Sequence, residues 1–134
     1  MAKSIPLGTR GDSEQRVEFK HTLTAWREEL PPVYATPQMI GQMEAAAFYA
    51  MLPFCEEDEV SVGTAINVTH RAPAVVGMVI KTEAVLESRD GRFYRFRVSA
   101  HNGHEVIGYG TVHRAIVSKS HFEARQREKP TSPQ

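Results

Sequence analysis

The sequence of 134 residues predicts one α+β domain in which an antiparallel sheet wraps around a single long helix. Three observations indicate this fold. Residues 37–52 alone have the length and apolar spacing of a long helix. Apolar and polar residues alternate along most of the chain after position 60, as in strands, and Asp90-Gly91 and Asn102-Gly103 are typical of tight hairpin turns. A long apolar helix with no second helix to cover it must be covered by the sheet.

The composition excludes several classes of protein. Sixteen basic and sixteen acidic residues give a formal net charge of zero, so there is no overall attraction to nucleic acid or to an anionic membrane. An apolar fraction of 41% is enough for one packed core, which excludes disordered, collagen-like and disulfide-rich chains. The lone Cys55 cannot form a disulfide within the chain, and no apolar run is long enough to span a membrane. We therefore expect a cytoplasmic protein without a nucleic-acid or membrane partner.

The two ends of the chain are expected to lie outside the folded domain. Residues 1–14 are polar and are expected to be flexible, residues 15–118 form the domain, and residues 119–134 form a polar tail. A short surface helix around Phe122–Arg127 is the alternative for that tail. Gln15–Leu23 alternates apolar and polar residues and predicts the first strand, and Pro31-Pro32 makes the segment that follows a loop.

The long helix has a clear beginning and end. Thr36 is suited to cap its first turn with the side-chain hydroxyl, and Pro37 suits the first helical position, where its missing N–H is not needed. Met39 and Met43 repeat at helical spacing among four alanines, and Pro53 ends the helix. Because the helix is apolar nearly all round, we expect it to be buried.

The remaining chain predicts four antiparallel strands, at 60–70, 75–87, 92–100 and 106–117, of which the last three form a meander. A strand, a loop, a buried helix and four strands in this order are the layout of the hot-dog fold. The core of such a domain is usually completed by a second copy of the chain, so we expect a homodimer, with a tetramer as a further possibility.

Three residues are candidates for chemistry. Glu44 lies in the middle of the apolar helix, where a carboxylate is rare without a partner or a function. It either reaches solvent or an arginine from the helix edge, or is held in a cleft as a base or nucleophile. His70 is expected to face the core at the end of a strand, together with Val62 and Ile66, as a core histidine or a catalytic one. Thr36 is a plain cap, or it lies where a helix N-terminus stabilises negative charge.

Other candidates are weaker. Three histidines lie near one hairpin: His101, His104 and His113. They lack a carboxylate or cysteine to complete a metal site, so no metal or other cofactor is expected. Cys55 precedes an acidic run that disfavours a reactive thiolate. Three arginines of one strand predict a solvated face, with phosphate binding as the alternative: Arg92, Arg95 and Arg97.

The sequence resembles the hot-dog thioesterases of the fluoroacetyl-CoA thioesterase type over about residues 15–125. Four segments carry the resemblance: VYATPQMIGQMEAAA (33–47), VGTAINVTHRAPA (62–74), RVSAHNGHEVIGYGT (97–111) and HRAIV (113–117).

The resemblance implies a role for five residues. It implies that Thr36, Glu44 and His70 form the catalytic set, that Gly63 lies near the thioester carbonyl, and that Arg114 contributes to binding coenzyme A. It also implies an acyl-CoA substrate.

One segment departs from the fluoroacetyl-specific pattern. The stretch before the threonine reads TAWREELPPVYAT, and Arg27 and Leu30 occupy positions where that pattern has aromatic lid residues. This departure favours a general acyl-thioester substrate over a fluoroacetyl-selective one.

We therefore expect hydrolysis of a small acyl-CoA to the free acid and coenzyme A. Two alternatives use the same pocket: an acyl-CoA or acyl-carrier binding protein without turnover, and an enoyl-thioester hydratase.

Overall fold

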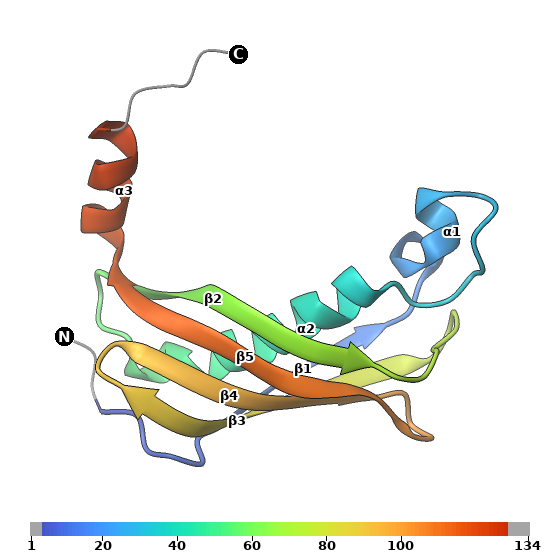
Figure 1. The fold of residues 1–134 in the computed structure, drawn as a ribbon, viewed down its shortest axis with the longest axis horizontal. Helices are drawn as coiled ribbons and strands as arrows, with labels where there is room; N and C mark the ends of the chain where they lie inside the picture. The colour runs from blue at the N-terminus through green and yellow to red at the C-terminus, as the bar shows by residue number, and fades with distance from the viewer. Residues whose placement is uncertain (1–3, 129–134) are drawn as a thin grey trace.

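A computed structural model describes residues 4–128, and residues 1–3 and 129–134 lie outside the described part. Five antiparallel strands form one curved sheet in the order β1-β3-β4-β5-β2, with helix α2 against one face (Figure 1). The predicted α+β hot-dog layout is confirmed. The strands are β1 (Arg10–Arg16), β2 (Glu59–His70), β3 (Val79–Asp90), β4 (Phe93–His101) and β5 (Val106–Ser118). The helices are α1 (Leu23–Trp26), α2 (Thr36–Met51) and α3 (Lys119–Glu128), with 3₁₀ turns at Phe19–His21 and Leu52–Phe54.

The predicted long helix is confirmed, but only one of its faces is buried. Methionines and small alanines of α2 pack against the sheet with almost no exposed surface: Met39, Met43, Ala46, Ala47, Ala50 and Met51. Small residues allow the helix to lie close to β1, where a Cβ added at Gly11 would lie 2.1 Å from the carbonyl oxygen of Ala46. The opposite face of α2 exposes Tyr49, because the single chain has only one sheet layer.

The strand meander forms as predicted. Asp90-Gly91 joins β3 to β4, with Gly91 at a φ of 62°, and Asn102-Gly103 lies in the turn before β5, with Gly103 at 95°. Both glycines therefore have the left-handed backbone that such turns require. The Asn102 carboxamide oxygen also accepts hydrogen bonds from the backbone N–H groups of His104 and Glu105, which fixes the second turn.

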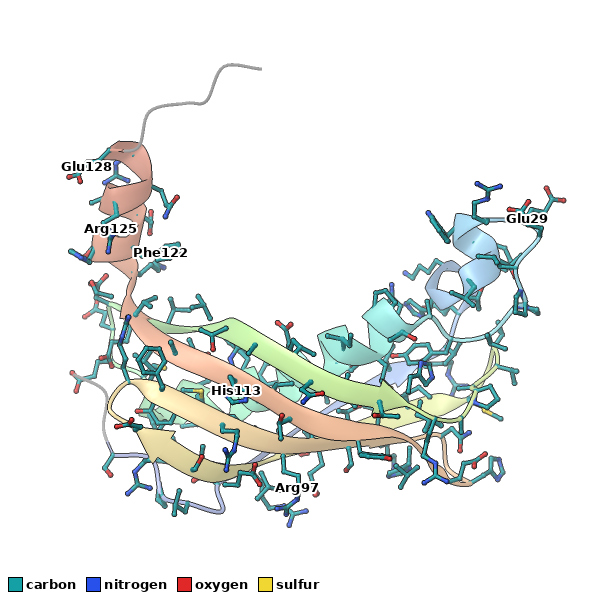
Figure 2. All side chains as sticks on the ribbon, in the orientation of Figure 1. Glu29, Arg97, His113, Phe122, Arg125 and Glu128 are labelled. Carbon is teal, nitrogen blue, oxygen red and sulfur yellow. The ribbon has the colours of Figure 1, made fainter. Side chains whose placement is uncertain are left out.

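The two faces of β4 also follow the prediction. Tyr94, Phe96 and Val98 are buried toward α2. Arg95 and Arg97 extend from the other face, where both pair with Glu87. Nε of Arg95 lies 2.8 Å from Oε2 of Glu87, and Nη1 of Arg97 lies 3.8 Å from Oε1. Figure 2 shows Arg97 and His113 on strands β4 and β5 of this outer face. The arginines form a solvated, ion-paired surface.

The first strand lies earlier in the chain than predicted. Strand β1 covers Arg10–Arg16 and pairs with β3, whereas the expected strand at Gln15–Leu23 is wrong. After Arg16 the chain turns, because the His21 ring accepts a hydrogen bond from the Glu18 N–H and the Thr22 hydroxyl donates to the Phe19 carbonyl. The segment 1–14, expected to be flexible, thus contributes to the sheet from Arg10 onward.

The expected polar tail begins with a helix. Helix α3 covers Lys119–Glu128, longer than the alternative at Phe122–Arg127, and residues 129–134 of the expected tail lie outside the described part. Asp58 anchors its start by accepting hydrogen bonds from Ser118 and Ser120, which lower the pKa of the Asp58 carboxyl. Figure 2 shows α3, with Phe122, Arg125 and Glu128, projecting away from the sheet, and Glu29 beyond α1 at the opposite end.

Candidate active site

Thr36 and His70 form a hydrogen-bonded pair between α2 and the end of β2. The Thr36 hydroxyl lies 2.8 Å from Nδ1 of His70. The prediction that Thr36 caps the helix is wrong: Ala35 is the N-cap residue, Thr36 is the first helical residue, and its side chain makes no capping hydrogen bond. The hydroxyl is directed to the histidine instead.

The His70 ring is half-buried, as its predicted orientation toward the core requires. Burial lowers the pKa of His70 below its ordinary value of 6.5, and the backbone of Ala72 offsets part of this effect. Its Nε2 is buried and makes no hydrogen bond of normal geometry within residues 4–128. The ring borders an open cleft of about 300 Å³, which Leu23, Val33 and Thr36 also line. A neutral imidazole that borders a cleft and is held by a hydroxyl at Nδ1 is suited to general acid–base chemistry.

Glu44 lies in a second group of residues, with Gly63 on β2 and Arg114 on β5. The side chain of Glu44 is 40% exposed, and its Oε2 lies 3.8 Å from Nη1 of Arg114. A Cβ added at Gly63 would lie 3.2 Å from the same Oε2. In the single chain the Glu44 carboxylate lies at the helix edge, where it reaches both an arginine and solvent.

Arg114 is a buried residue in this group. Its side chain is 6% exposed, and the ring of Phe48 lies 5.8 Å from its guanidinium carbon. Burial lowers the pKa of Arg114, and the charge of Glu44 raises it in opposition. Arg114 lies directly opposite Gly63 in the β2–β5 ladder, which brings the guanidinium to the same place as Glu44.

An irregularity in β2 gives Gly63 and His70 the same orientation. The pairing of β2 with β5 shifts between Gly63 and Ala65, which inserts one extra residue. Gly63 therefore faces Glu44 of α2, and His70, seven residues later, faces Thr36 of the same helix. The expectation that Val62 shares a face with His70 is wrong, because the bulge reverses the alternation between them.

The two groups do not meet in one chain. Thr36 and Glu44 are eight residues apart on α2, about 12 Å along the axis, and Gly63 and His70 are roughly 20 Å apart along β2. The structure thus brings Thr36 to His70 and Glu44 to Gly63 and Arg114, as two separate halves.

The weaker candidates gain no support as reactive sites. Burial raises the pKa of the Cys55 thiol, and the charge of Glu59 adds to this effect, so the thiol is poorly suited to act as a nucleophile. Within residues 4–128 no three His, Cys, Asp or Glu side chains are arranged to hold a metal ion. A larger open hollow of about 660 Å³ on the outer face contains Lys81, Glu83 and His101 but neither half of the site.

Ser61 was missed by the sequence reasoning. It is buried on β2, two residues before Gly63, and it holds Arg114 through two hydrogen bonds. A serine in an alternating strand gives no signal of such a role, because its partner lies 53 residues away.

A sequence profile of the fluoroacetyl-CoA-specific thioesterases matches residues 17–120 of this chain. The fluoroacetyl-CoA thioesterase of Streptantibioticus cattleyicolor is 46% identical over 101 residues, which cover 75% of this chain and 73% of that protein. A solved structure of a fluoroacetyl-CoA thioesterase is 37% identical with a TM-score of 0.89, covering 96% of this chain and all of the other.

A hot-dog-like protein from Thermanaerovibrio acidaminovorans shares the fold, with a TM-score of 0.85, 24% identity, and coverage of 95% and 96% of the two chains. The fold and the relatives together define the class as the hot-dog thioesterases. Within that class, the chain belongs to the family of fluoroacetyl-CoA-specific thioesterases.

Proposed function

We propose that this protein hydrolyses the thioester of a small acyl-CoA to the free acid and coenzyme A, with Glu44 as the reactive carboxylate. The observation that carries this proposal is the placement of Glu44: a half-exposed carboxylate, beside a buried arginine and a glycine, in a chain that belongs to a thioesterase family. The comparison enzyme from Streptantibioticus cattleyicolor is named for a CoA thioester substrate, which supports the same class of substrate here.

In the reaction, a C–O bond forms at the thioester carbonyl carbon and the C–S bond breaks. Glu44 either attacks that carbon, with water cleaving the resulting anhydride, or removes a proton from the attacking water. His70 and Thr36 orient the reacting groups and deliver a proton to the leaving sulfur. The Gly63 N–H and the N-terminus of α2 are the groups proposed to polarise the carbonyl.

We propose that the site is shared between two copies of the chain. The side of α2 away from the sheet exposes Tyr49, and the 3₁₀ turn after it exposes Leu52; their exposed fractions are 54% and 50%, and these apolar groups suit contact with a second copy. Strand β2 lies at one end of the strand order, so its outer edge is open to pair with the same strand of a partner. Antiparallel pairing centred near Ile66 and Asn67 places Gly63 of one copy close to His70 of the other.

The acyl group is proposed to be small and is not restricted to fluoroacetyl. Leu30 and Arg27 stand where the fluoroacetyl-specific pattern has aromatic residues, and Arg27 is ion-paired with Glu29. Coenzyme A thioesters and the lone free cysteine, Cys55, fit a reducing compartment such as the cytoplasm. None of the helices within residues 4–128 is long and apolar enough to cross a membrane.

The test is release of free thiol from acetyl-, fluoroacetyl-, phenylacetyl- and longer acyl-CoAs by the wild type and by Glu44→Ala. Turnover that falls by at least a hundredfold in Glu44→Ala supports the proposal, with Glu123→Gln on α3 as a control that keeps full activity. Binding of acyl-CoA without thiol release overturns it in favour of a binding protein. Loss of enoyl absorbance without thiol release overturns it in favour of a hydratase.

A further inference from the structure

Ser61 and Arg114 form a buried contact beside Glu44. The Nε–H of Arg114 donates to the hydroxyl oxygen of Ser61 at 3.0 Å, and Nη2 donates to the backbone carbonyl oxygen of the same serine at 2.9 Å. One residue thus accepts hydrogen bonds along a whole edge of the planar guanidinium. Ser61 is 4% exposed and Arg114 is 5% exposed, so water does not compete freely for these bonds.

This contact determines where the rest of the guanidinium points. With Nε and Nη2 held by Ser61, the remaining nitrogen, Nη1, lies 3.8 Å from Oε2 of Glu44. Phe48 follows Glu44 by one helical turn, and its ring covers the guanidinium from the same helix. Because a guanidinium is rigid and always charged, fixing one edge fixes the direction of its charge.

Glu44 is the carboxylate that balances this buried charge. Its 3.8 Å separation from Arg114 is an ion pair and is too long for a hydrogen bond. Arg114 therefore attracts the Glu44 carboxylate and keeps it beside Gly63 without forming a hydrogen bond to Oε2. Oε2 is left free to react.

We propose that Ser61 is a positioning residue of the active site: by fixing Arg114, it holds the Glu44 carboxylate beside Gly63. This inference rests on the proposed thioesterase function and gives Arg114 a different role from the coenzyme A binding that the family resemblance implies. Ser61 occupies the Nε–Nη2 edge of the guanidinium, and the burial of Arg114, which is 5% exposed, limits the approach of a phosphate to the Nη1–Nη2 edge that remains.

The kinetic test uses two thioesters of the same acyl group, one with coenzyme A and one with pantetheine, which lacks the nucleotide. Ser61→Ala removes the hydroxyl acceptor and lets the guanidinium pivot about the remaining carbonyl contact. We expect kcat to fall about tenfold on both thioesters with little change in KM, and Ser61→Thr, which keeps the oxygen, to retain more activity than Ser61→Ala. A rise in KM on the coenzyme A thioester alone overturns the proposal, because it indicates nucleotide binding.

The matched control is Ser13→Ala. The Ser13 hydroxyl also donates to α2, at the Gln42 carbonyl, from the other end of the sheet, so this variant loses a comparable hydrogen bond without touching Arg114. We expect kcat of Ser13→Ala to stay within twofold of the wild type. An equal loss of kcat in both serine variants overturns the proposal, since general loosening of the helix then explains the effect. Should Ser61→Ala not fold, Arg114→Lys, which keeps the charge but loses the fork, provides the same kinetic comparison.

A crystal structure of Ser61→Ala separates this inference from the proposed function. Displacement of the guanidinium and of the Glu44 carboxylate in this variant supports the positioning role of Ser61. It does so even if the wild type turns over no thioester, because absence of turnover overturns only the thioesterase proposal. An Arg114–Glu44 pair that keeps its position without the Ser61 hydroxyl overturns the inference, whatever the activity.

Discussion

Gly63→Ala tests whether the position of the Glu44 carboxylate limits the reaction. The added Cβ would lie 3.2 Å from Oε2, 3.5 Å from the carboxyl carbon of Glu44 and 3.7 Å from Nη1 of Arg114. Ordinary contacts are about 3.5–4.0 Å, so the carboxylate must move by a few tenths of an ångström. Since a misplacement of about 1 Å can reduce rates by about a hundredfold, we expect a loss of about tenfold in kcat.

Gly11→Ala serves as the contrasting variant. Its Cβ would meet the backbone of α2 at 2.1 Å, where nothing flexible can move aside. We expect Gly11→Ala to lose about 1–3 kcal/mol of unfolding free energy, whereas Gly63→Ala loses less than about 1 kcal/mol. Thiol release measures the activity, and urea unfolding measures the stability. Wild-type turnover in Gly63→Ala would refute the reasoning, because the carboxylate would then tolerate displacement.

Two further predictions concern the Thr36–His70 pair. Thr36→Val removes the hydroxyl that lies against Nδ1 of His70. We expect kcat to fall about 10–100-fold. Stability should change by no more than about 1 kcal/mol, because Thr36 is exposed, and unchanged turnover would contradict this prediction. Burial holds the pKa of His70 below its ordinary 6.5, so the folded state favours the neutral ring. This stabilising preference is present above pH 6.5 and is lost as pH falls through the lowered pKa. The unfolding free energy is therefore expected to fall as pH drops below 6.5. His70→Asn is expected to remove that part of the pH dependence of stability, and an equally acid-sensitive His70→Asn would exclude His70 as the cause.

The features of the fold that local sequence signals encode were predictable. The apolar spacing of residues 37–52 and the two glycine turns at 91 and 103 identify the long helix and the meander without reference to distant residues. Strand β1 lacks such a signal. Its helix-facing side consists of Gly11, Ser13 and Gln15, because the helix lies too close to β1 for large apolar side chains.

The candidate site was predictable only as residue types. Glu44 and His70 stand out in the sequence as polar groups on apolar faces. The bulge after Gly63 turns both Gly63 and His70 toward α2, and it depends on the pairing of β2 with β5, a strand more than forty residues away. The partner of Thr36 likewise comes from the end of β2 rather than from its own helix, so local capping rules assign the hydroxyl wrongly. Contacts between distant residues therefore determine which of the candidates meet.

Complementation between two inactive variants tests most directly the central claim that Glu44 of one chain works with His70 of another. Glu44→Ala and His70→Asn are each expected to be inactive, and are mixed in equal amounts under conditions that exchange subunits. Half of the dimers are then mixed, and each has one intact site of two, so the account predicts recovery of about 25% of wild-type thiol release. No recovery in a mixture shown to contain mixed dimers would contradict the shared site.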